Sequence, residues 1–216
     1  MLDRAEILRY LGASGRNSVL DKLIERAEAE VIQTAHPRHV YKRVSLQADM
    51  DTGSVQLASR VLVSRDLAKH LHGCNEGFLF ACTLGTEVDS LVKRYSLIDV
   101  PMLPVVQAVA GTYIEFYANQ AQKELEIYGA EHGLFLRPRY SPGYGDFQLE
   151  CQRILFDILE IPKKIGVSLT DSFLMVPFKS ITAVIGLSAD PSLCHVNKCM
   201  TCTAMNCPFR KEIPIE

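Results

Sequence analysis

The spacing of apolar residues changes along the chain, and this change most constrains the fold. In residues 18–32 apolar side chains recur every three or four positions, which predicts an amphipathic helix. From Val40 the spacing becomes two, so residues 40–46 and 54–63 each predict a strand. The intervening residues 49–53 contain two aspartates and a glycine, which are typical of a hairpin turn.

The second half of the chain begins with a predicted strand, continues with helices and ends with strands. Residues 77–84 form a compact apolar run that predicts a buried strand. Helical spacing returns at residues 104–128 and again at 147–159, and residues 174–177 and 180–186 predict two final strands. Strands early, helices in the middle and strands late indicate an α+β fold, in which a mostly antiparallel twisted sheet is flanked by helices.

Short polar side chains precede several of the expected helices. Their oxygen atoms can accept hydrogen bonds from N–H groups of the first helical turn. The predicted caps are Asp3, Asn17 or Ser18, Ser64, Thr86 with Asp89, and Asp146.

Length and charge exclude several classes of protein. The chain has 216 residues, of which 23 are basic and 25 acidic, and no basic run suits nucleic acid. The longest uncharged stretch, 100–114, is too short to span a membrane, and the first residues lack the pattern of a signal peptide, so we expect a cytoplasmic protein without membrane contact. We expect one domain over 1–190, with a helical part at about 1–36, and a cysteine-rich tail over 191–216.

The loop at 137–146 is the best candidate for a binding site. Its prolines restrict the backbone, its glycines allow a close approach, and it carries two arginines and two tyrosines. Such a loop can hold an anionic, partly aromatic ligand. An ordinary surface turn before a helix is the alternative.

Residues 139–144, the helix after them and residues 165–177 together resemble the activation domain of cobalamin-dependent methionine synthase. That family has an Arg-Pro-Ala-Pro-Gly-Tyr loop, a helix, and then a Gly-Met-x-Leu-Thr-(Glu/Asp)-Ser-Phe-x-Met-x-Pro segment. Residues 110–115 also fall where the family has a helix of the Gly-Ser-x-x-x-Glu kind. The resemblance implies a methionine synthase activation domain-like fold.

The resemblance also implies that the loop binds S-adenosylmethionine. Arg139 is then a bidentate partner for the ligand's carboxylate, and Tyr144 stacks on or hydrogen-bonds to the adenosine. Glu115 balances the ammonium or sulfonium charge; a glutamate on a solvated helix face is the alternative. The residues that we expect to bind S-adenosylmethionine are Arg139, Ser141, Pro142, Gly143, Tyr144 and Glu115. Residues 145–148 depart from the family, which continues with Pro-Ala-Cys-Pro and a histidine, so contacts to adenosine are expected to differ.

The implied function is repair in methionine biosynthesis. Family members support reductive methylation of cob(II)alamin, for which a separate donor supplies one electron and S-adenosylmethionine supplies the methyl group. The protein is then a component of methionine synthase methyltransferase activity with no catalytic base of its own. Because the chain has no Asp-x-His-x-x-Gly motif, cobalamin is expected on a partner: a methionine synthase that lacks its own activation domain.

Four cysteines near the end of the sequence form a separate motif. Cys194, Cys199, Cys202 and Cys207 have the spacing C-x4-C-x2-C-x4-C-P, which suits zinc or an iron–sulfur cluster. Reduced thiols in a tail are the alternative reading. The motif leaves two other functions open: a metal-cluster redox protein, or an interaction module for another corrinoid protein. The other three cysteines, Cys74, Cys82 and Cys151, are expected to pack in the core.

Overall fold

The computed structural model describes residues 2–13 and 17–194. The helices are α1 (Arg4–Leu11), α2 (Ser18–Thr34), α3 (Arg65–His70), α4 (Thr86–Ile98), α5 (Leu103–Glu131), α6 (Gln152–Leu159) and α7 (Ile161–Ile165). The strands are β1 (Arg38–Ala48), β2 (Ser54–Leu57), β3 (Arg60–Val63), β4 (Glu76–Thr83), β5 (Phe135–Leu136), β6 (Ser168–Leu169), β7 (Met175–Val176) and β8 (Ser180–Ser188). No described helix is both long enough and apolar enough to cross a membrane.

Six of these strands form one sheet in the order β3-β2-β1-β4-β8-β5. Every neighbouring pair in it is antiparallel, and β6 and β7 form a small second sheet. The predicted α+β fold with a mostly antiparallel sheet is therefore confirmed. Strand β8 lies inside the sheet, between β4 and β5.

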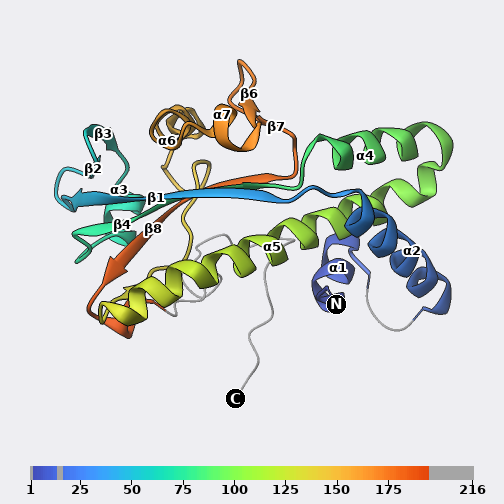
Figure 1. The fold of residues 1–216 in the computed structure, drawn as a ribbon, viewed down its shortest axis with the longest axis horizontal. Coiled ribbons are helices and arrows are strands. Elements are labelled where there is room, and N and C mark those ends of the chain that lie inside the picture. Colours follow the sequence, from blue (N-terminus) through green and yellow to red (C-terminus); the bar gives the residue numbers. More distant parts are fainter. Residues whose placement is uncertain (1, 14–16, 195–216) are drawn as a thin grey trace.

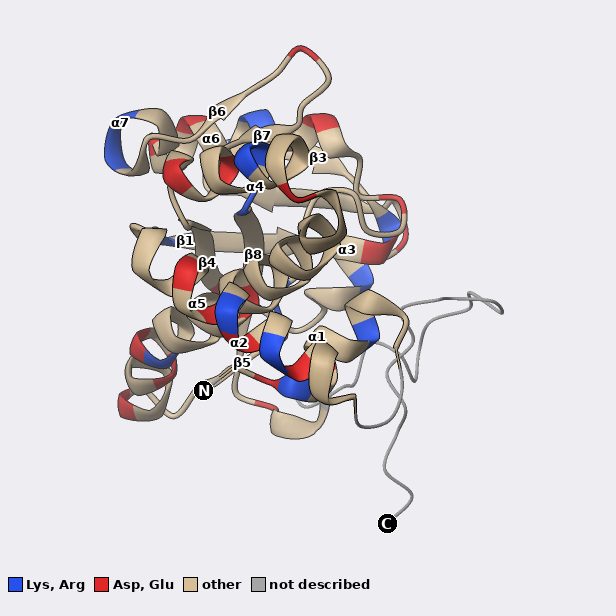
Figure 2. Ribbon diagram, turned by 90° about the vertical axis from the view of Figure 1, so that its right-hand side faces the viewer, with Lys and Arg blue, Asp and Glu red and all other residues tan. Residues whose placement is uncertain are grey.

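Helices cover both faces of this sheet (Figure 1). The long helix α5 lies against one face, while α6, α7 and the β6–β7 pair lie against the other. Helices α1, α2 and α4 pack around one end of α5. In the view of Figure 2, basic and acidic residues are interspersed over these elements.

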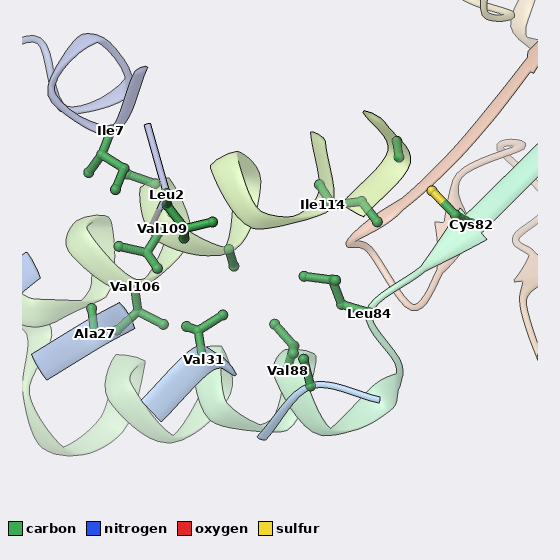
Figure 3. Close-up of a cluster of buried hydrophobic side chains, with 14 of the residues drawn as sticks. Leu2, Ile7, Ala27, Val31, Cys82, Leu84, Val88, Val106, Val109 and Ile114 are labelled. Carbon is green, nitrogen blue, oxygen red and sulfur yellow. The ribbon is translucent and has the colours of Figure 1, made fainter. Parts of the chain in front are cut away.

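The two faces of β4 are both buried, which explains its continuous apolar sequence. Phe78, Phe80 and Cys82 point into the core beside α5, and Leu79 and Ala81 point into the core beside α6 and α7. Figure 3 shows how helices complete the first core, with side chains that converge from the N-terminal segment, α2, α4 and α5: Leu2, Ile7, Ala27, Val31, Val88, Val106 and Val109.

The three isolated cysteines pack as predicted. Cys74 and Cys82 are buried and Cys151 is partly buried. Burial raises the pKa of Cys82 to about 12, because the thiolate cannot be solvated there. These residues therefore serve as small apolar side chains.

Three predicted caps are confirmed. The Asp3 carboxylate accepts hydrogen bonds from the N–H groups of Ala5 and Glu6, and the Asn17 side chain does the same at the start of α2. The Ser64 hydroxyl accepts from the Leu67 N–H at the start of α3. Each of these caps lies immediately before the first residue of its helix.

Two local predictions are wrong. Residues 54–63 form two strands rather than one, because Ala58 has a left-handed φ of 53° and reverses the chain between β2 and β3. Helix α4 is preceded by Gly85, with no side-chain cap, so Thr86 with Asp89 does not form the expected capping pair. The Asp89 carboxylate instead accepts a hydrogen bond from the backbone N–H of Phe178, at 2.8 Å.

Candidate functional site

A cavity of about 750 Å³ lies between α5, the loop at 137–146 and the start of β8. Its wall contains charged groups of both signs, amides and aromatic rings. From these three segments the lining residues include Glu115, Asn119, Gln122, Glu126, Arg137, Arg139, Ser141, Pro142, Tyr144, Ser180, Ile181 and Thr182. Five of the six residues predicted to bind S-adenosylmethionine thus face one space, and Gly143 is the sixth.

The wall formed by α5 is a polar stripe on a largely apolar helix. Glu115, Asn119, Gln122 and Glu126 follow one another at intervals of three or four residues, so they share one face of the helix. The opposite face of α5 carries core residues such as Val109. The helix therefore forms one wall of the cavity and part of the core at the same time.

Arg139 binds three of the polar groups on this stripe. Its Nη1 donates to Gln122 Oε1 at 2.8 Å, and its Nη2 donates to Asn119 Oδ1 at 2.8 Å and to Glu115 Oε2 at 3.0 Å. The side chain of Arg139 is 15% exposed and that of Glu115 is 44% exposed. Glu115 is thus the ion-pair partner of Arg139 and still reaches solvent.

The loop is fixed to β8 through Tyr140. The N–H of Tyr140 donates to the carbonyl of Val184 at 2.9 Å, and the N–H of Val184 donates to the carbonyl of Tyr140 at 2.8 Å. The Tyr140 ring lies 4.8 Å from the ring of His70, centre to centre, and His70 Nε2 is 2.8 Å from the carbonyl oxygen of Pro138. These contacts hold the arginine at 139 against α5.

The turn at Gly143 exposes Tyr144. Gly143 has a φ of 97°, a conformation that favours glycine, and its N–H donates to the Phe147 carbonyl at 2.7 Å. The ring of Tyr144 is about half exposed and meets the Tyr140 ring edge-on. Partial burial, and then the nearby Glu115 carboxylate, raise the pKa of Tyr144, so the phenol stays protonated and can donate. Gly143 shapes the turn without lining the cavity.

Asp146 closes the loop by capping a distant helix, which corrects the prediction that it caps the helix after it. That next helix starts later, with a short 3-10 turn at Leu149–Cys151 before α6. The Asp146 carboxylate accepts from the Ser64 hydroxyl at 2.5 Å and from the N–H groups of Arg65 and Asp66 at 2.8 and 3.1 Å. In return, the Asp66 carboxylate accepts from the Asp146 N–H at 3.0 Å.

Arg137 is a buried cation in the wall of the same cavity. The residue is 2% exposed, and its Nη2 donates to the carbonyl of His72 at 3.0 Å. Its Nε has no hydrogen-bond partner among the residues that the structure describes. Arg137 therefore adds a second guanidinium to a site in which Arg139 is already paired.

A second cavity of about 380 Å³ adjoins the first. Glu115 and Ile181 line both, so the Glu115 carboxylate stands at the boundary between the two spaces. The far side of the second cavity is formed by Tyr10 of α1, Gly111 of α5 and Lys179 at the start of β8. The N-terminal helix thus reaches the site region.

Several residues that line the two cavities were not predicted from the sequence. Asn119 and Gln122 follow Glu115 at helical spacing in α5, and this spacing was the available signal. Lys179 and Tyr10 have no local signal, because they meet α5 only through the tertiary fold.

Of the four cysteines predicted to bind a metal, the structure describes only Cys194. Cys194 is 9% exposed, lines the large cavity and has a raised pKa, chiefly through burial. Cys199, Cys202 and Cys207 lie outside the described residues, so the metal site stays a prediction. Within residues 2–13 and 17–194, no three His, Cys, Asp or Glu side chains are grouped to hold a metal ion.

Comparison with known proteins identifies a family and a similar fold. Residues 76–204 match the family model described as vitamin B12 dependent methionine synthase, activation domain. Among solved structures, a crystal structure of the MetH reactivation domain bound to AdoHcy is similar, with a TM-score of 0.66 and 16% sequence identity over 91% of this chain and 75% of that chain. At this identity the structural likeness shows a shared fold. No curated protein matches the sequence.

Proposed function

Because the chain belongs to the family of vitamin B12-dependent methionine synthase activation domains, we propose that it binds S-adenosylmethionine in the 750 Å³ cavity and supports the reactivation of a cobalamin-dependent methionine synthase. The single observation that carries this proposal is the gathering of Arg139, Glu115 and Tyr144 around one cavity inside the matched region. The similar reactivation domain was crystallised with AdoHcy, which is S-adenosylmethionine without its transferable methyl group.

The cavity suits a zwitterionic nucleoside in size and chemistry. Ligand pockets usually enclose about 300–1,000 Å³ and combine apolar surface with a few polar groups. Here the Glu115 carboxylate can attract a positive charge and the exposed face of Tyr144 can stack on a purine. Ser141 and Pro142 line the same wall, and Gly143 gives the turn its shape.

Arg139 remains the carboxylate partner that the resemblance implies. In the structure Gln122, Asn119 and Glu115 already accept from its guanidinium, so a ligand carboxylate would compete with these protein groups. The Glu115 pair is the most accessible of the three, because the Glu115 side chain reaches solvent. Arg139 can therefore act either on the ligand or through Glu115.

The proposed reaction needs positioning rather than acid–base catalysis. Cobalamin on the partner would supply the nucleophile after a separate donor has provided one electron, and S-adenosylmethionine would supply the methyl group and leave as S-adenosylhomocysteine. No proton is transferred in these steps. The contribution of this chain is to hold the sulfonium with its methyl group accessible, which reduces the entropic cost of the encounter.

Calorimetric titration with S-adenosylmethionine tests the ligand. We expect binding by the parent protein, at least about tenfold weaker binding by Arg139→Ala, and unchanged binding by Arg60→Ala, whose arginine pairs with Asp157 away from the cavity. Absence of binding by the folded parent would overturn the ligand assignment.

Reconstitution tests the partner. A cobalamin-dependent methionine synthase truncated before its activation domain should regain turnover after oxidation when this protein, S-adenosylmethionine and a one-electron reductant are added. Restoration that does not depend on this protein would contradict the proposal.

Metal analysis of anaerobically purified protein tests the cysteine motif separately, and protein without stoichiometric zinc or iron would remove that prediction.

A further inference from the structure

The small cavity contains a lysine with few protein partners. The Nζ of Lys179 donates to the carbonyl of Gln107 at 3.3 Å, and no described carboxylate lies within 4.0 Å of it. An ammonium group has three N–H donors, so this contact leaves donors available. Partial burial lowers the pKa of Lys179, and the negative charge of Asp89 offsets part of this shift. A partly buried cation in this position gains free energy from an anionic ligand.

The backbone holds Lys179 rigidly at this place. Its carbonyl accepts from the Leu84 N–H at 2.9 Å, and the preceding Phe178 N–H is bound by Asp89. The ammonium group therefore extends from a fixed strand end toward α5, beside Tyr10 and Gly111.

Gly111 keeps the space in front of the ammonium open. A glycine inside a helix lowers stability relative to alanine. Neither a positive φ nor close packing requires it here, because a Cβ would lie 3.8 Å from Tyr10 Cε2 and 3.9 Å from Lys179 Nζ, which are ordinary contacts. A side chain at 111 would instead occupy the cavity between these two groups.

We infer that the second cavity is the amino-acid subsite of the ligand, in which Lys179 binds the carboxylate of S-adenosylmethionine and Glu115 binds its ammonium group. This inference rests on the proposed function. The adenosine then lies in the large cavity, and the ligand crosses from one space to the other past Glu115, which lines both. A zwitterionic amino acid fits this arrangement, because an anion site and a cation site face one cavity of about 380 Å³.

Arg139 receives a different role in this arrangement. It orients the Glu115 carboxylate through the 3.0 Å ion pair and is a positioning residue. The two assignments predict different responses to a ligand without a carboxylate, so they can be separated.

The experiment is a calorimetric comparison of S-adenosylmethionine, decarboxylated S-adenosylmethionine and 5′-methylthioadenosine. For Lys179→Met we expect S-adenosylmethionine to bind at least about tenfold more weakly, with little change for the two ligands that lack the carboxylate. Lys179→Arg should recover part of the affinity. Lys163→Met is the matched control, since the Lys163 side chain is 82% exposed on α7.

A second variant makes the test independent of charge. Gly111→Met favours the helix and fills the small cavity. It should therefore weaken the binding of S-adenosylmethionine but leave the binding of 5′-methylthioadenosine unchanged. Arg139→Met should weaken the binding of S-adenosylmethionine and of its decarboxylated form to a similar extent. If the parent binds S-adenosylmethionine and Lys179→Met binds it equally well, this inference is overturned and the proposed function stands. If the parent binds no S-adenosylmethionine, both fail.

Discussion

Replacing Asp146 by alanine tests how the loop at 137–146 is held. The change removes an acceptor for the Ser64 hydroxyl and for two N–H groups in the first turn of α3. A capping side chain contributes about 0.5–2 kcal/mol. Asp146 is exposed and solvent weakens its interactions, so we place its contribution near the middle of this range, at about 1 kcal/mol. For a chain of this size the loss corresponds to a fall in Tm of about 2–4 °C.

The pH dependence of this loss has a definite sign. Hydrogen bonds from the Ser64 hydroxyl and from backbone N–H groups lower the pKa of Asp146 in the folded protein. Below the ordinary aspartate pKa of about 3.9 the unfolded chain then binds more protons than the folded one, so stability from Asp146 is lost as the pH falls. The difference between the parent and Asp146→Ala should be constant near neutral pH and shrink toward pH 3.

Chemical denaturation at several pH values is the assay. Asp146→Asn should lose less than Asp146→Ala, because asparagine keeps one capping oxygen. Asn17→Ala is the matched control: it removes a local cap of α2, which lines neither cavity, and should destabilise the protein without weakening the binding of S-adenosylmethionine, whereas Asp146→Ala should weaken it. The reasoning would be refuted if the parent and Asp146→Ala unfolded at the same denaturant concentration. It would also be refuted if the difference in their stability were as large at pH 3 as at neutral pH.

Three further predictions concern the core and the loop. Phe80→Ala should cost about 3–5 kcal/mol in chemical denaturation, since Phe80 is fully buried; a loss below about 1 kcal/mol would contradict its placement. Gly145→Ala should destabilise more than Gly133→Ala in thermal unfolding, because both have a positive φ but only at Gly145 does a Cβ meet another atom, at 2.1 Å from Asp66 Oδ2. Cys82 should resist alkylation at pH 8 until the protein unfolds, as followed by mass spectrometry, because its pKa is about 12.

The sequence predicts those parts of the fold whose causes lie within a few residues. Asp3, Asn17 and Ser64 cap helices that start beside them, and the apolar run of β4 is buried on both faces. The function of Asp146 is the same kind of cap, but its helix starts some eighty positions earlier in the sequence. A rule that reads neighbouring residues cannot find a partner brought close by the fold.

The same limit applies to turns and to the site. The reversal at Ala58 lacks the glycine or asparagine that usually indicates a left-handed residue. In the site, resemblance gave the loop residues and Glu115, while the spacing along α5 could have given Asn119 and Gln122. Lys179 depends on β8 meeting α5, which is a property of the assembled sheet.

The position of β8 in the sheet has a consequence for synthesis of the chain. β4 is made early, but one of its edges stays unpaired until β8 has left the ribosome. At about 5–20 residues per second this wait lasts roughly 5–20 s, during which an apolar strand edge is open to wrong pairing. The same strand supplies Ser180, Ile181 and Thr182 to the large cavity. The cavity in which we propose that S-adenosylmethionine binds can therefore form only once β8 has been made and can complete the sheet.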